Sequence, residues 1–194
     1  MRHLPRLAQD DTLPALFRPL LTPVLEHLQQ IAARIGECDA RIREHARQSE
    51  SAQRLQDIVG LGPLTASALI ATIANPRDFR NGRQMSAWGG LVPRQHSSGG
   101  KTRLGPITKR GDTYLRGLLT QGARSTMPLA LKREPIRRSR LEHWIVALHG
   151  RAGYHKTLVA IANKHLRTVW AILAHGENYD PNAWRRHPHL AQHA

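Results

Sequence analysis

Apolar side chains recur near the start of the chain at alternating steps of three and four residues. The repeating positions are Leu28, Ile31, Ile35, Cys38 and Ile42. This spacing places them on one face of a helix and is that of a heptad seam. Thr22 can cap such a helix, and Pro23 can occupy its first position. The pattern predicts an irregular lead-in over residues 1–22 and a coiled-coil-like helical arm over residues 23–50. With only two to three heptads, a dimerising coiled coil and a long helix lying on its own domain fit equally well.

A second domain is predicted over residues 51–176, after a hinge at residues 49–51. Its apolar positions return at helical spacing in six segments. These are residues 52–59, 63–74, 82–88, 112–131, 141–149 and 154–174. Strand signals are weak, so the expected fold class is mainly α. Residues 177–194 are polar and rich in His and Pro, which predicts a flexible tail.

Positive charge narrows the choice of partner. Lys and Arg number 29 against 14 Asp and Glu, a net charge of +15. The excess is concentrated between Arg94 and Arg140, which favours a polyanionic partner over a uniformly solvated surface. The single cysteine excludes an internal disulfide and a multi-cysteine zinc site, which fits a reducing cytoplasm. No apolar run is long enough to cross a bilayer, so no membrane partner is expected. No metal site is expected in this chain either, because the histidines of the predicted flexible tail, His187, His189 and His193, would have no surrounding structure to orient them as ligands.

The segment over residues 55–74 is typical of a helix-hairpin-helix. Gly60 and Gly62 permit a tight turn, and Pro63 can open the second helix. The backbone N–H groups of such a turn, together with Thr65, suit a phosphate oxygen and read no base. The alternative is a helical hairpin used only for packing.

The segment over residues 89–123 combines hydroxyl groups, glycines and cations. Ser97 and Ser98 precede Gly99-Gly100 in a loop that cannot be a regular helix. The cations predicted to hold phosphates are Arg94, Lys101, Arg103, Lys109, Arg110 and Arg116. A serine among such groups can attack a phosphodiester, with the cations stabilising the charge that develops. From the residue types alone, a phosphate-binding loop without catalysis is favoured.

Residues 55–127 resemble the C-terminal domain of the DEDD insertion-sequence transposases, the insertion-sequence family numbered one hundred and ten and its relatives. The order and spacing of many residues carry the resemblance. They are Ile58, Gly60, Gly62, Thr65, Ala66, Gly90, Pro93, Ser98-Gly99-Gly100, Gly105, Ile107, Lys109, Gly111, Leu115-Arg116 and Ala123.

The resemblance implies a concrete chemistry. Those transposases join a metal-dependent nuclease domain to a coiled-coil arm and to a second domain that carries a serine nucleophile. They exchange DNA strands through a covalent phosphoserine link, guided by a structured bridge RNA. The family's serine corresponds to Ser98, with Ser97 as the less favoured choice. The arm implies a homo-oligomer or pairing with a separate nuclease half.

One departure from the family is large. The nuclease domain, which supplies four carboxylates and would bind Mg²⁺, has no counterpart in the 22 residues before the arm. We therefore expect the chain to be the C-terminal part of a transposase, not competent without that domain. The alternatives are an inactive transposase remnant, a nonenzymatic nucleic-acid-binding module, and a structural RNA-associated protein of ribosomal type. The pattern over residues 89–123 counts against the last.

Overall fold

Helix α2 (Arg18–Gln48) is the first element of the computed structural model, which describes residues 18–95 and 103–181. The prediction that this helix begins at Pro23 is wrong, because the helix starts at Arg18 and Pro23 lies inside it. Pro19 occupies the first turn instead, where a missing N–H costs no intrahelical hydrogen bond. The predicted hinge at residues 49–51 is reduced to Ser49, whose side chain accepts a hydrogen bond from the backbone N–H of Ala52.

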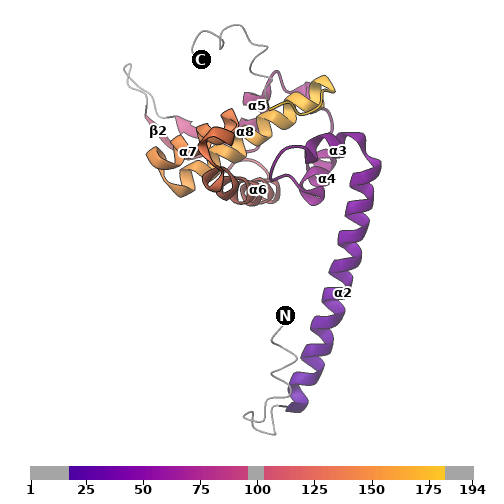
Figure 1. Cartoon of the computed structure of the whole chain (residues 1–194). Coiled ribbons are helices and arrows are strands. Elements are labelled where there is room, and N and C mark those ends of the chain that lie inside the picture. Colours follow the sequence, from indigo (N-terminus) through magenta and orange to yellow (C-terminus); the bar gives the residue numbers. More distant parts are fainter. Residues whose placement is uncertain (1–17, 96–102, 182–194) are drawn as a thin grey trace. The chain divides into compact units, whose positions relative to one another are not determined.

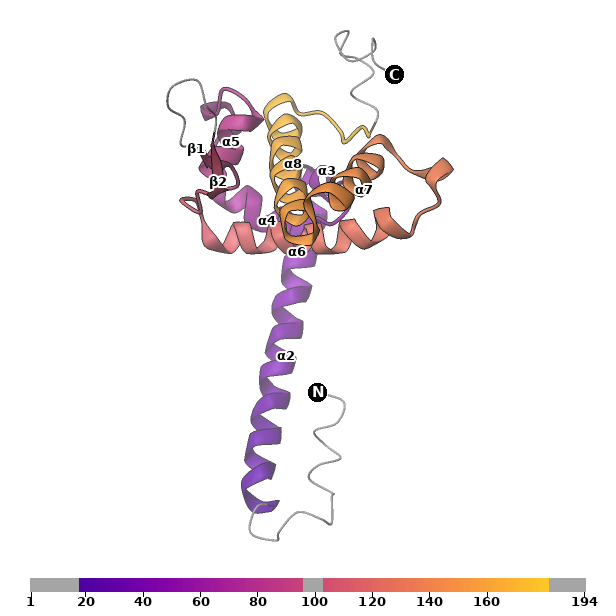
Figure 2. The ribbon, with the colours of Figure 1, turned by 90° about the vertical axis from the view of Figure 1, so that its left-hand side faces the viewer.

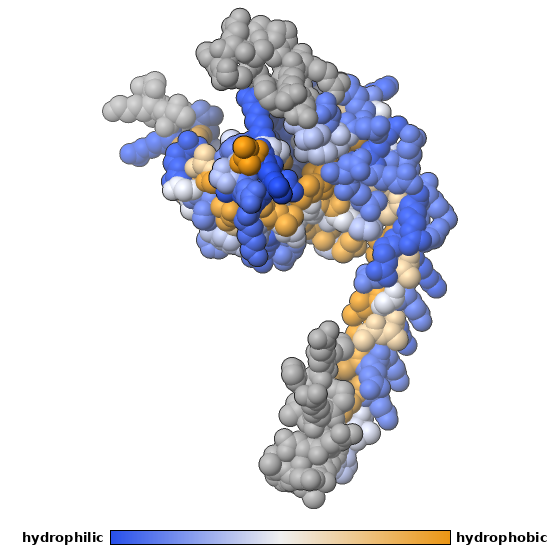
Figure 3. All heavy atoms as spheres, viewed as in Figure 1, coloured by the Kyte–Doolittle hydropathy of each residue, from blue (hydrophilic) through white to orange (hydrophobic). Residues whose placement is uncertain are grey.

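The chain divides into two units, one ending at Glu44 and the other beginning at His45. The first unit is described here only by α2. Its apolar positions are well exposed: Leu20 at 63%, Val24 at 54% and Ile35 at 54% of their surface. Figure 3 shows apolar residues gathered along one side of this helix. Of the predicted seam residues, Ile31 and Ile35 are exposed, whereas Leu28 and Ile42 are partly buried. We call the exposed apolar residues of this helix the α2 stripe.

The second unit is built from six further helices, two short 3₁₀ turns and a small hairpin (Figure 1). The helices are α3 (Glu50–Gln56), α4 (Pro63–Thr72), α5 (Gly82–Trp88), α6 (Thr113–Lys132), α7 (Arg140–Ala152) and α8 (Tyr154–His175). The 3₁₀ turns are η1 (Pro76–Asp78) and η2 (Pro135–Arg137), and the strands are β1 (Pro93–Gln95) and β2 (Leu104–Ile107). The mainly α prediction is confirmed, and the predicted bounds of α5 match those observed.

Helix α8 lies at the centre of the second unit, packed against α3, α5, α6 and α7. Figure 2 shows it crossing over α6, with α5 and α7 on either side. Its apolar face is buried through Leu158, Ile161, Ala162, Leu166 and Val169. The helix predicted over residues 154–174 from its apolar spacing is thus confirmed. Its opposite side carries Lys164 and Arg167.

Helix ends in the second unit follow from specific residues. Helix α4 ends at Thr72, two residues before the predicted end, and Asn75 then caps the turn that Pro76 opens. Helix α7 begins with a capping box, in which Ser139 and Glu142 each accept a hydrogen bond from the other's backbone N–H. Pro135 lies in η2 after α6 has ended, as its missing N–H predicts.

Candidate nucleic-acid interface

A two-stranded antiparallel hairpin, which the sequence did not predict, lies on either side of the Ser/Gly segment in the chain. Its strands β1 and β2 pair with Pro93 opposite Ile107 and Gln95 opposite Leu104. The register shifts between these pairs, so the hairpin contains an irregularity. The weak strand signal in the sequence reflects the short strands and the two prolines, which supply no backbone donor. Arg94 is exposed on β1, and exposed Arg103 directly precedes β2.

Close backbone packing holds the end of the hairpin against the turn after α5. A Cβ added to Gly111 would lie 2.2 Å from the carbonyl oxygen of Trp88. Gly90 has a φ of +68°, and a Cβ there would lie 2.7 Å from the backbone nitrogen of Gly111. Only glycine allows both approaches. This contact fixes the backbone of Lys109 and Arg110, whose side chains are exposed.

The start of α6 adds a further cation beside this turn. Asp112 caps the helix by accepting a hydrogen bond from the backbone N–H of Leu115 at 3.0 Å. Arg116 donates to the carbonyl oxygen of Gly111 at 3.1 Å and to the hydroxyl of Thr113 at 3.0 Å. The guanidinium therefore folds back over the helix start and stays partly exposed.

Five of the predicted phosphate-binding cations thus belong to the hairpin and to the turn and helix that follow it. We call them the hairpin cluster: Arg94, Arg103, Lys109, Arg110 and Arg116. Lys101 and the candidate nucleophiles Ser97 and Ser98 lie outside the described residues, in the sequence between β1 and β2.

The turn between α3 and α4 is built for packing on α6. Gly60 has a φ of +95°, and a Cβ there would lie 2.3 Å from the carbonyl oxygen of Gly122. The hydroxyl of Thr126 donates to the carbonyl oxygens of Val59 at 2.8 Å and of Gly122 at 2.9 Å. The turn between α3 and α4 therefore packs against α6, which is the packing alternative that the sequence left open.

The three predicted contact residues in this turn differ in their access to a ligand. Thr65 is 7% exposed, so its side chain lies in the core, and Gly60 is held against α6. Gly62 is exposed at the N-terminal end of the ten-residue helix α4. Of the three, Gly62 is the one whose surroundings leave room for a phosphate. The Gly60–Gly62 segment contacts α6 at Gly122, about two helical turns after Arg116. Helix α6 therefore supports both this segment and the hairpin cluster.

Part of the basic run over residues 132–140 is neutralised within the chain. Arg133 forms an ion pair with Glu142 at 2.9 Å, and Arg137 forms one with Glu134 at 3.3 Å. Burial opposes ionisation of Glu142, but hydrogen bonds from Ser139 and the charge of Arg133 outweigh it and lower the pKa of this carboxyl. The run therefore offers less free charge than its composition implies.

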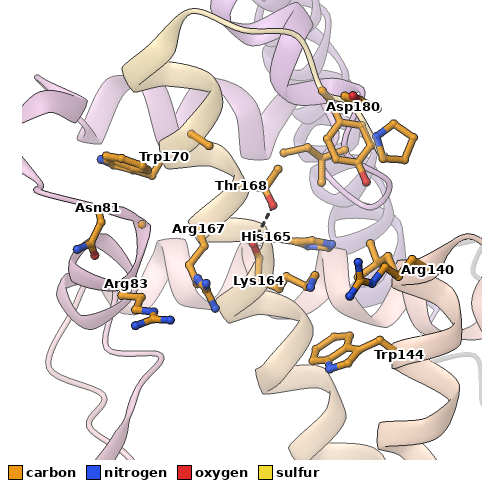
Figure 4. A pocket seen from close by; sticks show the side chains of 16 residues that line it. Asn81, Arg83, Arg140, Trp144, Lys164, His165, Arg167, Thr168, Trp170 and Asp180 are labelled. Atoms are coloured by element: carbon orange, nitrogen blue, oxygen red, sulfur yellow. Dashed lines mark hydrogen bonds between the residues drawn. The ribbon is translucent and has the colours of Figure 1, made fainter. Parts of the chain in front are cut away.

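The sequence-based reasoning missed a second basic site, which lies on the outer side of α8. Lys164 and Arg167 line a cavity of about 720 Å³ together with Arg83 of α5 and Trp144 of α7 (Figure 4). Their spacing on the face of α8 opposite its apolar residues was a visible signal. The contribution of α5 and α7 was not visible, because it depends on tertiary packing.

Residues 18–95 and 103–181 contain no cluster of three or more His, Cys, Asp or Glu side chains arranged to hold a metal ion. Within the same residues, no helix combines the length and apolar character needed to cross a membrane.

Part of the chain matches a known protein family in sequence. Residues 52–137 match the Transposase IS116/IS110/IS902 family. This matched segment runs from α3 to the end of η2 and includes the Gly60–Gly62 turn and the hairpin cluster.

Several curated transposases are similar over most of the chain. A "Probable family 20 transposase" of Pseudomonas aeruginosa is 43% identical over 169 residues, which are 87% of this chain and 49% of that protein. The transposase for insertion sequence element IS1328 of Yersinia enterocolitica is 34% identical over 176 residues, 91% of this chain and 52% of its own length. The transposase for insertion sequence element IS1111A of Coxiella burnetii is 40% identical over 145 residues, 75% and 39% of the two chains. The chain spans about half the length of the curated relatives it matches, or less.

Proposed function

We propose that this chain acts in the transposition of an insertion sequence, as the C-terminal part of a transposase that grips DNA and supplies a serine nucleophile. The observation that carries the proposal is the 43% identity to a transposase over 87% of the chain. The hairpin cluster lies inside the segment that matches the family, which supports a contact with phosphates. The phosphates of a nucleic acid would neutralise the exposed cations of the hairpin cluster.

The proposed reaction is an in-line displacement at a phosphodiester. The hydroxyl oxygen of Ser98 attacks phosphorus, and a covalent bond forms between serine and phosphate. The bond between phosphorus and the departing deoxyribose oxygen breaks, the serine proton leaves to a base, and the displaced oxygen takes up a proton. Exposed Lys109 and Arg110 can stabilise charge on the phosphate oxygens as it develops. Reversal with a different hydroxyl group would join exchanged strands.

The proposed partners follow from the same resemblance. Besides DNA, a structured bridge RNA would bind the basic surface, and the apolar stripe of α2 would pair with another helix. The nuclease chemistry of the family would come from a domain that supplies carboxylates and binds Mg²⁺. In this proposal the exposed cations of the hairpin cluster would hold the DNA, and Ser98 would form the bond to phosphorus.

The test is the formation of a covalent DNA adduct. The chain is mixed with a nuclease domain, bridge RNA and labelled insertion-sequence ends from the same element, and then resolved under denaturing conditions. We expect an adduct that disappears in Ser98→Ala and persists in Ser97→Ala. An adduct retained in Ser98→Ala would refute the assignment. Tight DNA binding without any adduct would favour the nonenzymatic nucleic-acid-binding module.

A further inference from the structure

The cavity above α8 is lined by more positive than negative charge. Its described lining holds four cations, Arg83, Arg140, Lys164 and Arg167, and one carboxylate, Asp180. Burial and the neighbouring charges of Arg167 and Arg140 lower the pKa of Lys164. The fold therefore keeps positive charges close enough to repel one another, and an anion bound in the cavity would offset this repulsion.

Backbone packing brings two of these cations together. Gly82 begins α5, and a Cβ at this position would lie 2.9 Å from the carbonyl oxygen of Arg167 and 3.0 Å from its Cα. The absence of a side chain lets α5 approach α8 at this level, which places Arg83 beside Arg167. Figure 4 shows both guanidinium groups extending into the same part of the cavity.

An aromatic ring lies beside the cations. Trp144 of α7 is partly exposed, and the ammonium of Lys164 lies 4.9 Å from the centroid of its ring. Trp170, also in the lining, is held in place because its indole N–H donates to the carbonyl oxygens of Pro76 and Phe79. Trp144 lines the cavity beside Lys164 and makes no such hydrogen bond to the described residues that would fix its ring in place. Lys164 has a flexible stem and can move from that face to a phosphate without a backbone change.

His165 is a buried polar side chain in the cavity wall, 2% exposed, whose ring nitrogens have no hydrogen-bond partner among the described residues. Buried polar atoms are nearly always paired, and an unpaired one calls for a reason. Figure 4 shows the ring extending from α8 toward the side of the cavity where Arg140 lies. A ligand there that accepts or donates a hydrogen bond would satisfy the imidazole.

We propose that this cavity binds one unpaired nucleotide of a nucleic-acid strand, with its phosphate on Arg83, Lys164 and Arg167 and its base on Trp144. His165 completes the site by a hydrogen bond to the bound nucleotide. A volume of about 720 Å³ is in the range of small-ligand pockets and accommodates a nucleotide. Base stacking on an aromatic side chain combined with cations along the backbone is the usual means of holding single strands. Duplex DNA does not offer such a base, because its bases are stacked and paired.

The inference rests on the proposed function only in taking nucleic acid as the ligand. Binding is therefore measured without catalysis, in the full chain carrying Ser98→Ala, by the fluorescence anisotropy of labelled oligodeoxythymidine and oligouridine. We expect Trp144→Ala to weaken binding by about tenfold, and Trp144→Phe to retain most of the affinity since it keeps a stacking ring. The preferred oligonucleotide identifies the strand as DNA or RNA.

Charge-matched variants separate a site from general attraction. Lys164→Ala with Arg167→Ala removes two charges in the cavity, and Arg124→Ala with Arg151→Ala removes two exposed charges elsewhere on α6 and α7. The cavity variant should lose at least about tenfold more affinity for the single strands than the control. Equal losses in the two double variants would overturn the proposal.

The environment of His165 gives a readout that does not depend on variants. In histidine-labelled protein, the ring resonances of His165 should shift when oligodeoxythymidine is added and stay unchanged with a fully paired duplex. Thymidine monophosphate at the same nucleotide concentration should bind more weakly than the oligonucleotide. Unshifted His165 resonances at saturation, or equal binding of the mononucleotide, would refute a strand site. Failure to detect a Ser98 adduct would leave this result unaffected.

Discussion

At the scale of the residue, His165 is a polar group that the core holds uncharged. Burial lowers its pKa from 6.5 to about 4, because the interior solvates the imidazolium poorly. In the unfolded chain the same side chain takes up a proton near pH 6.5. The contribution of neutral His165 to the free energy of unfolding is therefore complete above pH 6.5. It is lost as the pH falls from 6.5 toward 4, because the unfolded chain then binds a proton that the folded chain does not.

We expect the free energy of unfolding to fall by about 2 kcal/mol from His165 alone between pH 7 and pH 5. Urea denaturation of the full chain at the two pH values measures the loss. Leucine in His165→Leu fills a similar volume and has no titrating group. Between pH 7 and pH 5 the free energy of unfolding of this variant should therefore fall by about 2 kcal/mol less than that of the unmodified chain. The same pH dependence in both proteins would show that His165 does not titrate as its burial requires.

Two glycines of α6 offer a matched test of close packing. A Cβ at Gly122 would lie 2.4 Å from the carbonyl oxygen of Gly60, whereas a Cβ at Gly117 meets no atom within 4 Å. Gly122→Ala should therefore destabilise the fold by about 1–3 kcal/mol through overpacking. Gly117→Ala should stabilise it by about 0.5–1 kcal/mol, since alanine favours a helix more than glycine does. Thermal unfolding of the two variants checks the opposite signs, and destabilisation by both would count against the contact.

At the scale of the element, α2 carries an apolar stripe that the proposed pairing with another helix would bury. The stripe includes Val24, Ile31 and Ile35, all exposed. A charge placed on it would have to be buried in a coiled-coil seam, which is costly without a partner.

Ile35→Glu should weaken self-association by at least about tenfold, whereas Gln30→Glu, off the seam on the same helix, should have little effect. Sedimentation equilibrium of the full chain over a range of concentrations measures this difference. A concentration-independent monomer for the unmodified chain would contradict pairing between copies and leave another helix as the partner.

At the scale of the whole molecule, the distribution of charge would set the salt dependence of the proposed DNA binding. The chain carries a net charge of +15, but Arg133 and Arg137 are paired with Glu142 and Glu134. The hairpin cluster holds five cations. If each neutralises one duplex phosphate, the slope of log affinity against log salt is about −4 to −5.

Lys109→Ala with Arg110→Ala should reduce the magnitude of that slope by about 2, because each substitution removes one phosphate contact. Arg151→Ala should leave it nearly unchanged. Titrations of a duplex at several salt concentrations give the slope directly. A slope much steeper than about −5 would mean that a wider basic surface than the hairpin cluster meets the duplex.

Periodicity and local chemistry in the sequence determined most helices, since a 3.6-residue repeat and capping residues act within a single element. They predicted the bounds of α5 and the helices over residues 112–131 and 154–174, close to the observed α6 and α8. They also placed Lys109, Arg110 and Arg116 together, because these residues are close in the chain.

Tertiary structure alone decided the rest. The short hairpin forms because β2 meets β1, and the role of Gly60 is set by Gly122, which is distant in sequence. The cavity gathers Arg83, Trp144 and Lys164 from three helices. Periodicity shows which face of a helix is apolar but not which helix packs beside it, since that depends on the shapes of surfaces brought together only in the folded chain.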